Sequence, residues 1–244
     1  MVRIRKDVRN VYDTLFDILY REFNESHESY DKLLEFLAVD SCPPIMLDIE
    51  GKLEWFFSNR QLSERLINAY NLPLIKSDRY DYLGDIYIDN VIGASEAGRK
   101  GLYLTPQPVV EAICKMTLGE VNNKEVNILE PCVGSGRFLL TANKYAPNAN
   151  LYGVDKSLDM VRTSFTNAAI HNIRMYLLHA DSLLHDIGHS EPEGIYNWQF
   201  ANRWQSHYEK LKTIGSKPAE LPKPLELPKT TELPKNFQYN LFKK

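Results

Sequence analysis

The spacing of hydrophobic residues divides the chain into a helical first part and a second part in which short apolar runs alternate with amphipathic stretches. In the first part the apolar residues recur on one helix face. Four segments have this pattern: residues 2–23, 29–37, 62–70 and 82–93. Ser58-Asn59, just ahead of the third segment, is a candidate helix cap. We therefore expect residues 1–100 to form a helical N-terminal region, which either contacts a partner or DNA or covers an exposed edge of a sheet.

The second part has the pattern of an α/β fold. Short apolar runs predict strands over residues 126–129, 151–154 and 175–178, with a further candidate over residues 195–201. Amphipathic stretches predict helices over residues 106–118, 137–145 and 158–169. Alternating strands and helices indicate a parallel sheet with right-handed crossovers. The predicted fold class is therefore α/β: a partial Rossmann-like sheet of three to four parallel strands within a domain at residues 101–211, preceded by the helical region.

The helix expected over residues 106–118 has a start signal and an apolar stripe. Thr105 can cap it, with Pro106 at the first helical position. The stripe consists of Val109, Val110, Ile113 and Met116, which we expect to pack on the sheet. Ala168 and Ala169 would allow close approach of the helix over residues 158–169.

Residues 212–244 have a different composition from the rest of the chain. The sequence Glu-Leu-Pro-Lys occurs three times there, starting at Glu220, Glu226 and Glu232. Prolines at this density exclude helix and sheet interiors, so a polyproline-like or disordered tail is expected. A solvated spacer is the simplest role for it.

Composition limits the class of function. The net charge of −3 gives no support to autonomous DNA binding, which usually requires a basic excess. The three cysteines, Cys42, Cys114 and Cys132, lack metal or disulfide spacing, which fits a reducing compartment. No apolar run approaches membrane-spanning length, so we expect a cytoplasmic protein. The histidines form no ligand cluster, and no metal is expected.

A glycine loop follows the first predicted strand. Residues 127–140 read as a strand, a turn with Gly134 and Gly136, and the start of a helix. Glycines let a backbone approach a ligand closely, and the first N–H groups of a helix can face an anion or a polar edge. Two glycines alone are a weak signal, because a dinucleotide fingerprint would have a third.

Three predicted strands end in acidic residues. Glu130 and Asp155 close the first two, and Asp181 follows the third within the sequence His179-Ala180-Asp181. Asp155 lies about 20 residues past the glycines, where an acid can bind ribose hydroxyls. The carboxyl ends of parallel strands meet at one sheet edge, where open α/β folds bind ligands. The sequence therefore predicts a nucleotide-type ligand site at this edge.

These residues resemble a known family, the S-adenosylmethionine-dependent adenine-N6 DNA methyltransferases, particularly the modification subunits of type I restriction systems. Residues 130–139, Glu-Pro-Cys-Val-Gly-Ser-Gly-Arg-Phe-Leu, are similar to the family's Asp-Pro-Ala-Cys-Gly-Ser-Gly-Gly-Phe-Leu. Residues 101–106, Gly-Leu-Tyr-Leu-Thr-Pro, resemble its Gly-Gln-Phe-Tyr-Thr-Pro element, and residues 83–87 resemble the helix leading into it. A dehydrogenase is the alternative from the glycine loop and acid alone, but the elements before and after the loop favour the methyl donor.

The resemblance implies S-adenosylmethionine as cofactor. Tyr103, Thr105 and Pro106 would flank its methionine part, with the loop from Gly134 to Gly136 beneath. Asp155 would take the ribose, and Asp181 the adenine amino group. The full set of cofactor-binding residues that it implies is Tyr103, Thr105, Pro106, Glu130, Cys132, Gly134, Gly136, Phe138, Asp155, Lys156, Asp181 and Ser182.

The family's acceptor-binding motif, Asn/Asp-Pro-Pro-Tyr/Phe, is absent from the sequence. In the family its first residue accepts hydrogen bonds from the adenine amine and its aromatic ring stacks on the flipped base. Asn202 and Trp204 are the nearest match, with Arg203 where a proline should be and one residue too few between them. Without the prolines nothing fixes the carbonyl toward the amine, and a displacement of about 1 Å can cost on the order of a hundredfold in rate.

Three functions follow from this sequence. The first is a truncated protein of the family that binds S-adenosylmethionine and has weak or no independent methyl transfer. The second is an active DNA adenine methyltransferase with a degenerate catalytic loop, or one completed by a partner chain. The third is a non-enzymatic interaction scaffold. The resemblance also implies a protein partner, with DNA reached through that partner or a specificity subunit.

Overall fold

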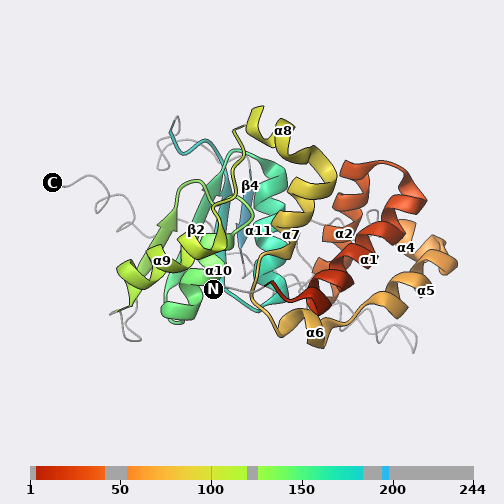
Figure 1. The fold of residues 1–244 in the computed structure, drawn as a ribbon, viewed down its shortest axis with the longest axis horizontal. Helices are drawn as coiled ribbons and strands as arrows, with labels where there is room; N and C mark the ends of the chain where they lie inside the picture. The colour runs from red at the N-terminus through yellow and green to blue at the C-terminus, as the bar shows by residue number, and fades with distance from the viewer. Residues whose placement is uncertain (1–3, 42–53, 100, 120–125, 184–193, 198–244) are drawn as a thin grey trace, which may run out of the picture.

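A four-stranded sheet and a group of N-terminal helices lie on opposite sides of the helix α11 (Leu158–Ile170) (Figure 1). The structure is a computed structural model that describes residues 4–41, 54–99, 101–119, 126–183 and 194–197. The strands are β1 (Asn127–Glu130), β2 (Asn150–Asp155), β3 (Met175–His179) and β4 (Gly194–Asn197). They are ordered β1-β2-β3-β4 in the sheet.

The first three strands are parallel, as predicted. Their register places Glu130 opposite Gly153 and Asp155 opposite His179. β4 pairs with β3 in the antiparallel direction, so the fourth strand does not extend the parallel part of the sheet. A parallel pair needs a crossover, usually a helix, whereas an antiparallel pair can follow a loop. Among the described residues between β3 and β4, none is helical.

The helices α10 (Arg137–Tyr145) and α11 (Leu158–Ile170) form the predicted crossovers. Both pack on the sheet face that carries Leu151, Met175 and Leu177, and all of these side chains belong to one buried cluster. Ala168 and Ala169 are buried in that cluster, which fits the close helix approach expected of them. Ser157 caps α11 by accepting a hydrogen bond from Met160 N–H at 3.4 Å.

Helix α9 (Gln107–Leu118) differs from its prediction in two ways. Its N-cap residue is Pro106 and has no side-chain cap, so the assignment of Thr105 as the cap is wrong. The buried side of α9, Val110 and Cys114, packs against Ala142 of α10. Val109 and Met116 are 46% and 80% exposed, so the predicted packing of the whole stripe on the sheet is wrong. The stripe follows helical spacing, but it packs against α10, and α10 covers only one side of it.

The N-terminal part consists of two longer helices followed by shorter ones. Their bounds are α1 (Lys6–Phe23), α2 (Ser26–Ser41), α4 (Glu54–Ser58), α5 (Arg60–Ala69), α6 (Leu72–Lys76), α7 (Tyr82–Ile86), the π-helix η1 (Tyr87–Ile92) and α8 (Gly93–Arg99). The predicted cap is confirmed, since Asn59 Oδ1 accepts a hydrogen bond from Leu62 N–H at 3.1 Å. Tyr12 and Leu15 of α1 are fully buried.

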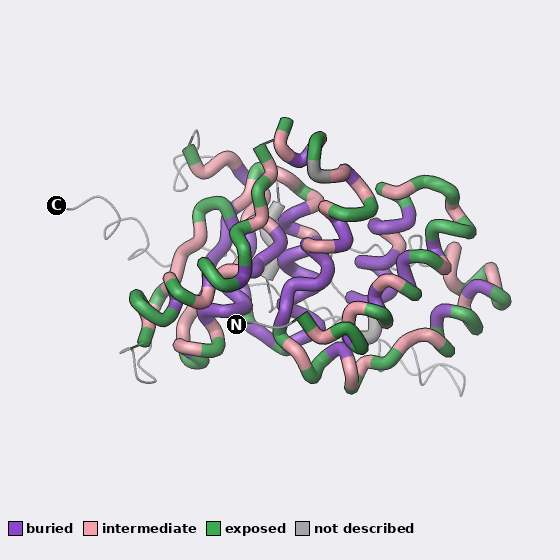
Figure 2. The backbone as a smooth tube through the Cα atoms, in the orientation of Figure 1, coloured by how far each residue is buried: buried purple, intermediate pink, exposed green. Residues whose placement is uncertain are grey.

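The N-terminal helices share a core with α11. Met160 and Ile170 of α11 belong to the same buried cluster as the apolar faces of α1 and α2. Polar contacts reinforce the join, because Tyr30 Oη lies 2.9 Å from Thr163 Oγ1 and Arg162 pairs with Asp31 at 3.2 Å. Most of α11 is coloured as buried in Figure 2. The described N-terminal helices thus pack on the outer side of α11, and the two roles expected for this part of the chain stay predictions.

Candidate functional site

Three acidic residues end the parallel strands at one edge of the sheet. Glu130 is the last residue of β1, Asp155 is the last of β2, and Asp181 follows β3 by two residues. Ala180 N–H donates to the Asp155 carbonyl at 3.0 Å, which ties the third segment to the second. All three side chains are half-buried, and burial raises the pKa of Glu130 above its usual range. The structure therefore brings together the carboxylates that the sequence placed at this edge.

Asp155 has a fixed orientation. Its Oδ2 accepts a hydrogen bond from Gly134 N–H at 2.8 Å, and its Oδ1 accepts one from Ser157 N–H at 2.8 Å. Each carboxylate oxygen can accept a second hydrogen bond, so the group keeps acceptor capacity toward the open edge. Hydrogen bonds from the glycine loop and from the N-terminus of α11 thus fix the orientation of this carboxylate.

The glycine loop satisfies most of its own backbone donors. Cys132 N–H donates to Glu130 Oε1 and Val133 N–H to the Val154 carbonyl, and Gly136 N–H donates to the Val133 carbonyl. With Gly134 N–H on Asp155, these four groups are not available to a phosphate. A pyrophosphate cradle needs such N–H groups free. These four N–H groups therefore do not form a pyrophosphate cradle.

Gly136 also contacts the protein. Its φ is 88°, in the left-handed region, and a Cβ there would lie 2.5 Å from Ser164 Oγ on α11. Glycine is therefore required both by conformation and by the close approach of α11. Contact of Gly136 with a ligand stays a prediction.

The segment from Tyr103 to Pro106 lies over the loop through Leu104. A Cβ added to Gly134 would meet Leu104 Cδ2 at 3.4 Å, so this leucine covers the glycine. Tyr103, Thr105 and Pro106 are exposed on either side of it. Tyr103 is 77% exposed, and its hydroxyl donates to the Gly98 carbonyl at 3.3 Å. The predicted neighbours of the methionine part therefore flank the loop and are open to solvent.

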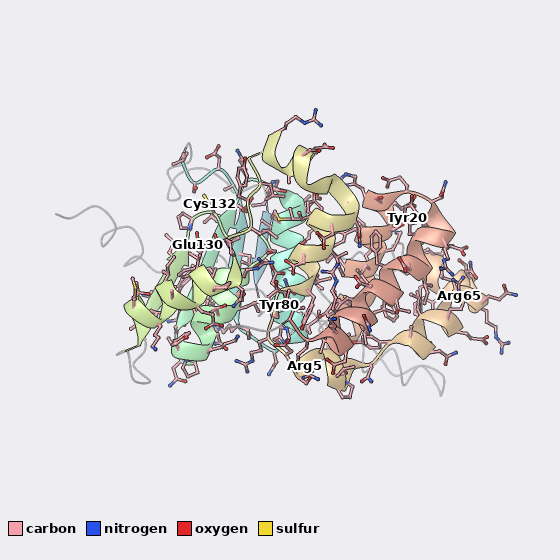
Figure 3. The ribbon with its side chains drawn as sticks, viewed as in Figure 1. Arg5, Tyr20, Arg65, Tyr80, Glu130 and Cys132 are labelled. Carbon is pink, nitrogen blue, oxygen red and sulfur yellow. The ribbon has the colours of Figure 1, made fainter. Side chains whose placement is uncertain are left out.

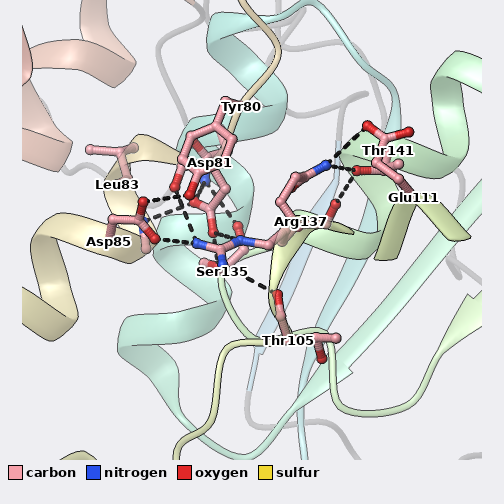
Figure 4. Close-up of polar contacts among 12 residues, drawn as sticks. Tyr80, Asp81, Leu83, Asp85, Thr105, Glu111, Ser135, Arg137 and Thr141 are labelled. Carbon is pink, nitrogen blue, oxygen red and sulfur yellow. Dashed lines mark hydrogen bonds and ion pairs between the residues drawn. The ribbon is translucent and has the colours of Figure 1, made fainter. Parts of the chain in front are cut away.

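A buried polar network beneath the loop was missed by sequence reasoning. Asp81, the N-cap residue of α7, is 1% exposed, and its carboxylate contacts Ser135, Arg137 and Asn167 (Figure 4). Arg137 Nε lies 3.1 Å from Asp81 Oδ2, and Asn167 Nδ2 lies 2.7 Å from Asp81 Oδ1. Burial raises the pKa of Asp81, and Arg137 and Ser135 oppose the rise. The only sequence signal was an aspartate in a cap position.

The other predicted residues are divided between the edge and the core. Cys132 is exposed two residues after β1, and Lys156 is exposed directly after β2. Ser182 is half-buried beside Asp181. Figure 3 shows Glu130 and Cys132 together on the sheet side of the molecule. Phe138 is partly buried against the core between α9, α10 and the sheet. Asn202 and Trp204 lie outside the described residues.

The part of the chain that the structure describes lacks both a metal-binding cluster and a membrane-spanning helix. No group of His, Cys, Asp or Glu side chains in this part of the chain could hold a metal ion. No described helix combines the length and the apolar character needed to cross a membrane.

Residues 78–214 match the model of the N-6 DNA Methylase family, which is more than half of the chain. The chain belongs to the N-6 DNA methylase family. The match begins just ahead of Asp81 and covers α7, the glycine loop and the strands that carry the three acids. Membership confirms the family that the glycine loop and the Tyr103 element predicted, and it makes this chain a methyltransferase-family protein.

A relative and two solved structures are similar to this family member. The release factor glutamine methyltransferase of Thermodesulfovibrio yellowstonii is 31% identical over 165 residues, covering 66% of this chain and 55% of that protein. The chain thus spans about half the length of the curated relative it matches. A class I S-adenosylmethionine-dependent methyltransferase structure from Listeria monocytogenes covers 75% of this chain and 55% of its own, with 16% identity and a TM-score of 0.52.

The second structure is a type I restriction-modification system methyltransferase subunit from Streptococcus thermophilus. It covers 77% of this chain and 61% of its own, with 14% identity and a TM-score of 0.45. The similarity to the Listeria structure confirms the predicted fold class, a class I methyltransferase fold with three parallel strands.

Proposed function

We propose that this chain binds S-adenosylmethionine at the edge formed by Glu130, Asp155 and Asp181. The orientation of Asp155 carries the proposal, because Gly134 N–H and Ser157 N–H fix a half-buried carboxylate whose remaining lone pairs can take ribose hydroxyls. S-adenosylmethionine, when bound, supplies a methyl group on a sulfonium. The residues of this chain bind and orient it.

The remaining contacts follow the order of the segments along the edge. Asp181 accepts from the adenine amino group, and Tyr103, Thr105 and Pro106 flank the methionine part. Glu130, Cys132, Lys156 and Ser182 border the same edge, and the loop from Gly134 to Gly136 lies beneath the ligand with Phe138 behind it. Carboxylates and hydroxyls suit a ligand rich in hydroxyl and amino donors, and the donors of the loop are already used within the protein.

Equilibrium dialysis with labelled S-adenosylmethionine tests the binding site. Asp155→Asn should weaken binding about tenfold or more, because it removes a charged acceptor of hydrogen bonds. Asp89→Asn is the matched control, since Asp89 is 57% exposed on η1 and pairs with Arg9. Equal affinity of the Asp155→Asn variant and wild type would refute the role of Asp155.

We propose further that methyl transfer to DNA adenine by this chain alone is weak or absent, and that a partner or specificity subunit brings the DNA. Support comes from the sequence, which lacks Asn/Asp-Pro-Pro-Tyr/Phe and has only Asn202 and Trp204 near its place. A net charge of −3 also disfavours unaided DNA binding. The domain organisation at residues 1–100, 101–211 and 212–244 is part of the same proposal, with the last segment as a spacer.

Transfer of labelled methyl groups to mixed-sequence DNA tests this second proposal. We expect a rate on the order of a hundredfold or more below that of a family enzyme that has the Asn/Asp-Pro-Pro-Tyr/Phe motif. Robust transfer by the chain alone that is lost in Asn202→Ala would instead favour an active enzyme with a degenerate catalytic loop. Robust transfer unchanged in that variant would refute the role of Asn202.

A second candidate acceptor comes from the relative of 31% identity. Its name describes a methyltransferase that acts on a glutamine of a release factor. The amide nitrogen of glutamine and the exocyclic amine of adenine are both planar NH₂ groups, so one site chemistry can serve either. A release factor supplied as substrate in parallel with DNA separates the two. A non-enzymatic scaffold remains the proposal if wild type binds no S-adenosylmethionine.

A further inference from the structure

Arg137 joins three segments that are distant in the sequence. Its Nε donates to Asp81 at 3.1 Å, its Nη1 donates to the Thr105 carbonyl at 3.2 Å, and its Nη2 donates to the carboxylate of Asp85. The side chain is 9% exposed. Figure 4 shows the guanidinium between the acids of α7 and the backbone at Thr105. A planar guanidinium directs its donors along fixed lines, so three separate acceptors define its position closely.

Asp81 extends this junction to the glycine loop. Its carboxylate accepts hydrogen bonds from Ser135 Oγ–H, from Asn167 Nδ2 at 2.7 Å and from Gly84 N–H at 2.8 Å. Asn167 also donates to the Ser135 carbonyl at 2.9 Å. Ser135 stands between the two glycines of the loop and is fully buried. One carboxylate therefore holds α7, the loop and α11 together.

Apolar contacts bring the same segments together. A Cβ on Gly84 would lie 2.8 Å from Leu104 Cδ1, and a Cβ on Gly134 would lie 3.4 Å from Leu104 Cδ2. Leu104 thus lies against two glycines, one on α7 and one in the loop. The residue after it, Thr105, is the one whose carbonyl Arg137 binds.

Stability alone is a weak reason for such an arrangement. A buried ion pair often stabilises a protein no more than apolar side chains of the same volume would. What a planar, multiply bonded pair provides is a defined relative position of the segments it joins. Here those segments are the two sides of the proposed site, the Tyr103 to Pro106 element and the loop.

We propose that Arg137 and Asp81 are positioning residues that hold the Tyr103 to Pro106 element against the glycine loop, so that the ligand site is formed before a ligand binds. The identity of the ligand rests on the proposed function, whereas the positioning does not. Both side chains are buried and act through Thr105 and Ser135. Helix α7, which precedes the strands, thereby becomes part of the binding unit.

Arg137→Lys tests this role, because lysine keeps the charge but cannot donate to three separate acceptors from a planar fork. Arg162→Lys is the matched control: Arg162 of α11 also pairs with an aspartate, Asp31 of α2, and so acts on the side of α11 that faces the N-terminal helices. We expect Arg137→Lys to weaken S-adenosylhomocysteine binding about tenfold or more, the scale seen when residues supporting a site are changed. Arg162→Lys should bind as wild type does at a temperature where both variants are folded.

Hydrogen exchange of the ligand-free proteins gives a readout that does not depend on the ligand. Amides in residues 101–110 and 131–140 should exchange faster in Arg137→Lys than in wild type, and no faster in Arg162→Lys. If Arg137→Lys does not fold, Asp85→Asn removes one partner of Arg137 at a side chain that is 20% exposed, with a smaller effect in the same direction.

The two proposals fail in different ways. If wild type binds no S-adenosylhomocysteine but the variants show the expected exchange, the proposed function fails and the positioning role stands. If exchange in both segments of the folded Arg137→Lys protein equals that of wild type, the positioning role is wrong. If the ligand binds wild type and Arg137→Lys with equal affinity, the positioning role is wrong as well.

Discussion

Gly84 of α7 lies directly against Ser135 of the glycine loop. A Cβ on Gly84 would lie 2.6 Å from Ser135 Oγ, closer than real Cβ contacts allow. The N-terminal helices and the glycine loop therefore meet at a point where a Cβ on residue 84 would force neighbouring side chains to shift.

Substitution of Gly84 tests that contact. Gly84→Ala should destabilise the protein by roughly 1–3 kcal/mol, because the added methyl group overpacks a buried junction and disturbs the carboxylate of Asp81. Gly98→Ala is the control, since a Cβ at Gly98 would meet only Tyr103 Oη at 3.4 Å. That variant should be neutral or more stable by up to about 1 kcal/mol, from helix propensity. Urea unfolding measures both, and an equal effect of the two substitutions would contradict the account.

Removal of the Asp81 carboxylate should be costly. Asp81→Ala leaves Arg137 buried without its main partner, and breaking a buried pair costs about 3–5 kcal/mol. Asp89→Ala breaks the exposed contact with Arg9 and should cost less than about 1 kcal/mol. Denaturant unfolding at neutral pH compares them. If Asp81→Ala lowers the free energy of unfolding no more than Asp89→Ala does, the network does not stabilise the contact between these segments.

The sequence could predict the parts of this structure that depend on periodicity. The three parallel strands, α10 and α11 follow directly from apolar runs and helical spacing, and the cap at Asn59 follows from its side chain. The acidic edge was also predictable, because parallel strands that end in Glu130 and Asp155 must end on the same side. Local patterns and chain direction suffice for these features.

Features that depend on contacts between distant segments could not be predicted in this way. Thr105 is a residue type that often caps helices, and it stands just ahead of the helix. Its carbonyl is bound by Arg137, however, and the helix starts after Pro106. The stripe on α9 has the correct period, yet α10 covers only the side with Val110 and Cys114. The network of Asp81 with Asn167 joins positions 86 residues apart, and no local pattern marks such a pairing.

His171 should make stability depend on pH. The side chain is 7% exposed, and neither ring nitrogen has a hydrogen-bond partner among the residues described. Burial, with Arg79, Lys144 and Lys76 nearby, lowers the pKa of His171 from 6.5 to about 4. The unfolded chain takes up a proton near pH 6.5 and the folded protein does not, so stability is retained above that pH and is lost as the pH falls toward 4.

Because of His171, the free energy of unfolding should fall by about 2 kcal/mol between pH 7.5 and pH 5. Urea unfolding at both pH values, for wild type and His171→Leu, measures it. Other groups contribute equally in the two proteins, so the variant should lose about that much less stability over the interval. An identical pH dependence of the two proteins would show that His171 titrates normally.

Thiol labelling should report on the site edge. Cys132 is exposed beside Glu130, whereas Cys114 is buried and burial raises the pKa of its thiol to about 11. In a Cys42→Ser background at pH 8, an aromatic disulfide reagent should label Cys132 rapidly and Cys114 only on unfolding. Saturating S-adenosylhomocysteine should slow the labelling of Cys132. Labelling of Cys132 that is unaffected by the ligand would place the ligand elsewhere.

The central claim is that the edge at Asp155 takes a methyl donor and not a dinucleotide. Calorimetric titration of the folded protein with S-adenosylhomocysteine, and separately with NAD, tests it most directly. The account predicts saturable heat with one site per chain for S-adenosylhomocysteine, loss of that heat in Asp155→Ala, and none for NAD. An absence of heat with S-adenosylhomocysteine at high micromolar concentration, or saturable heat with NAD alone, would contradict it.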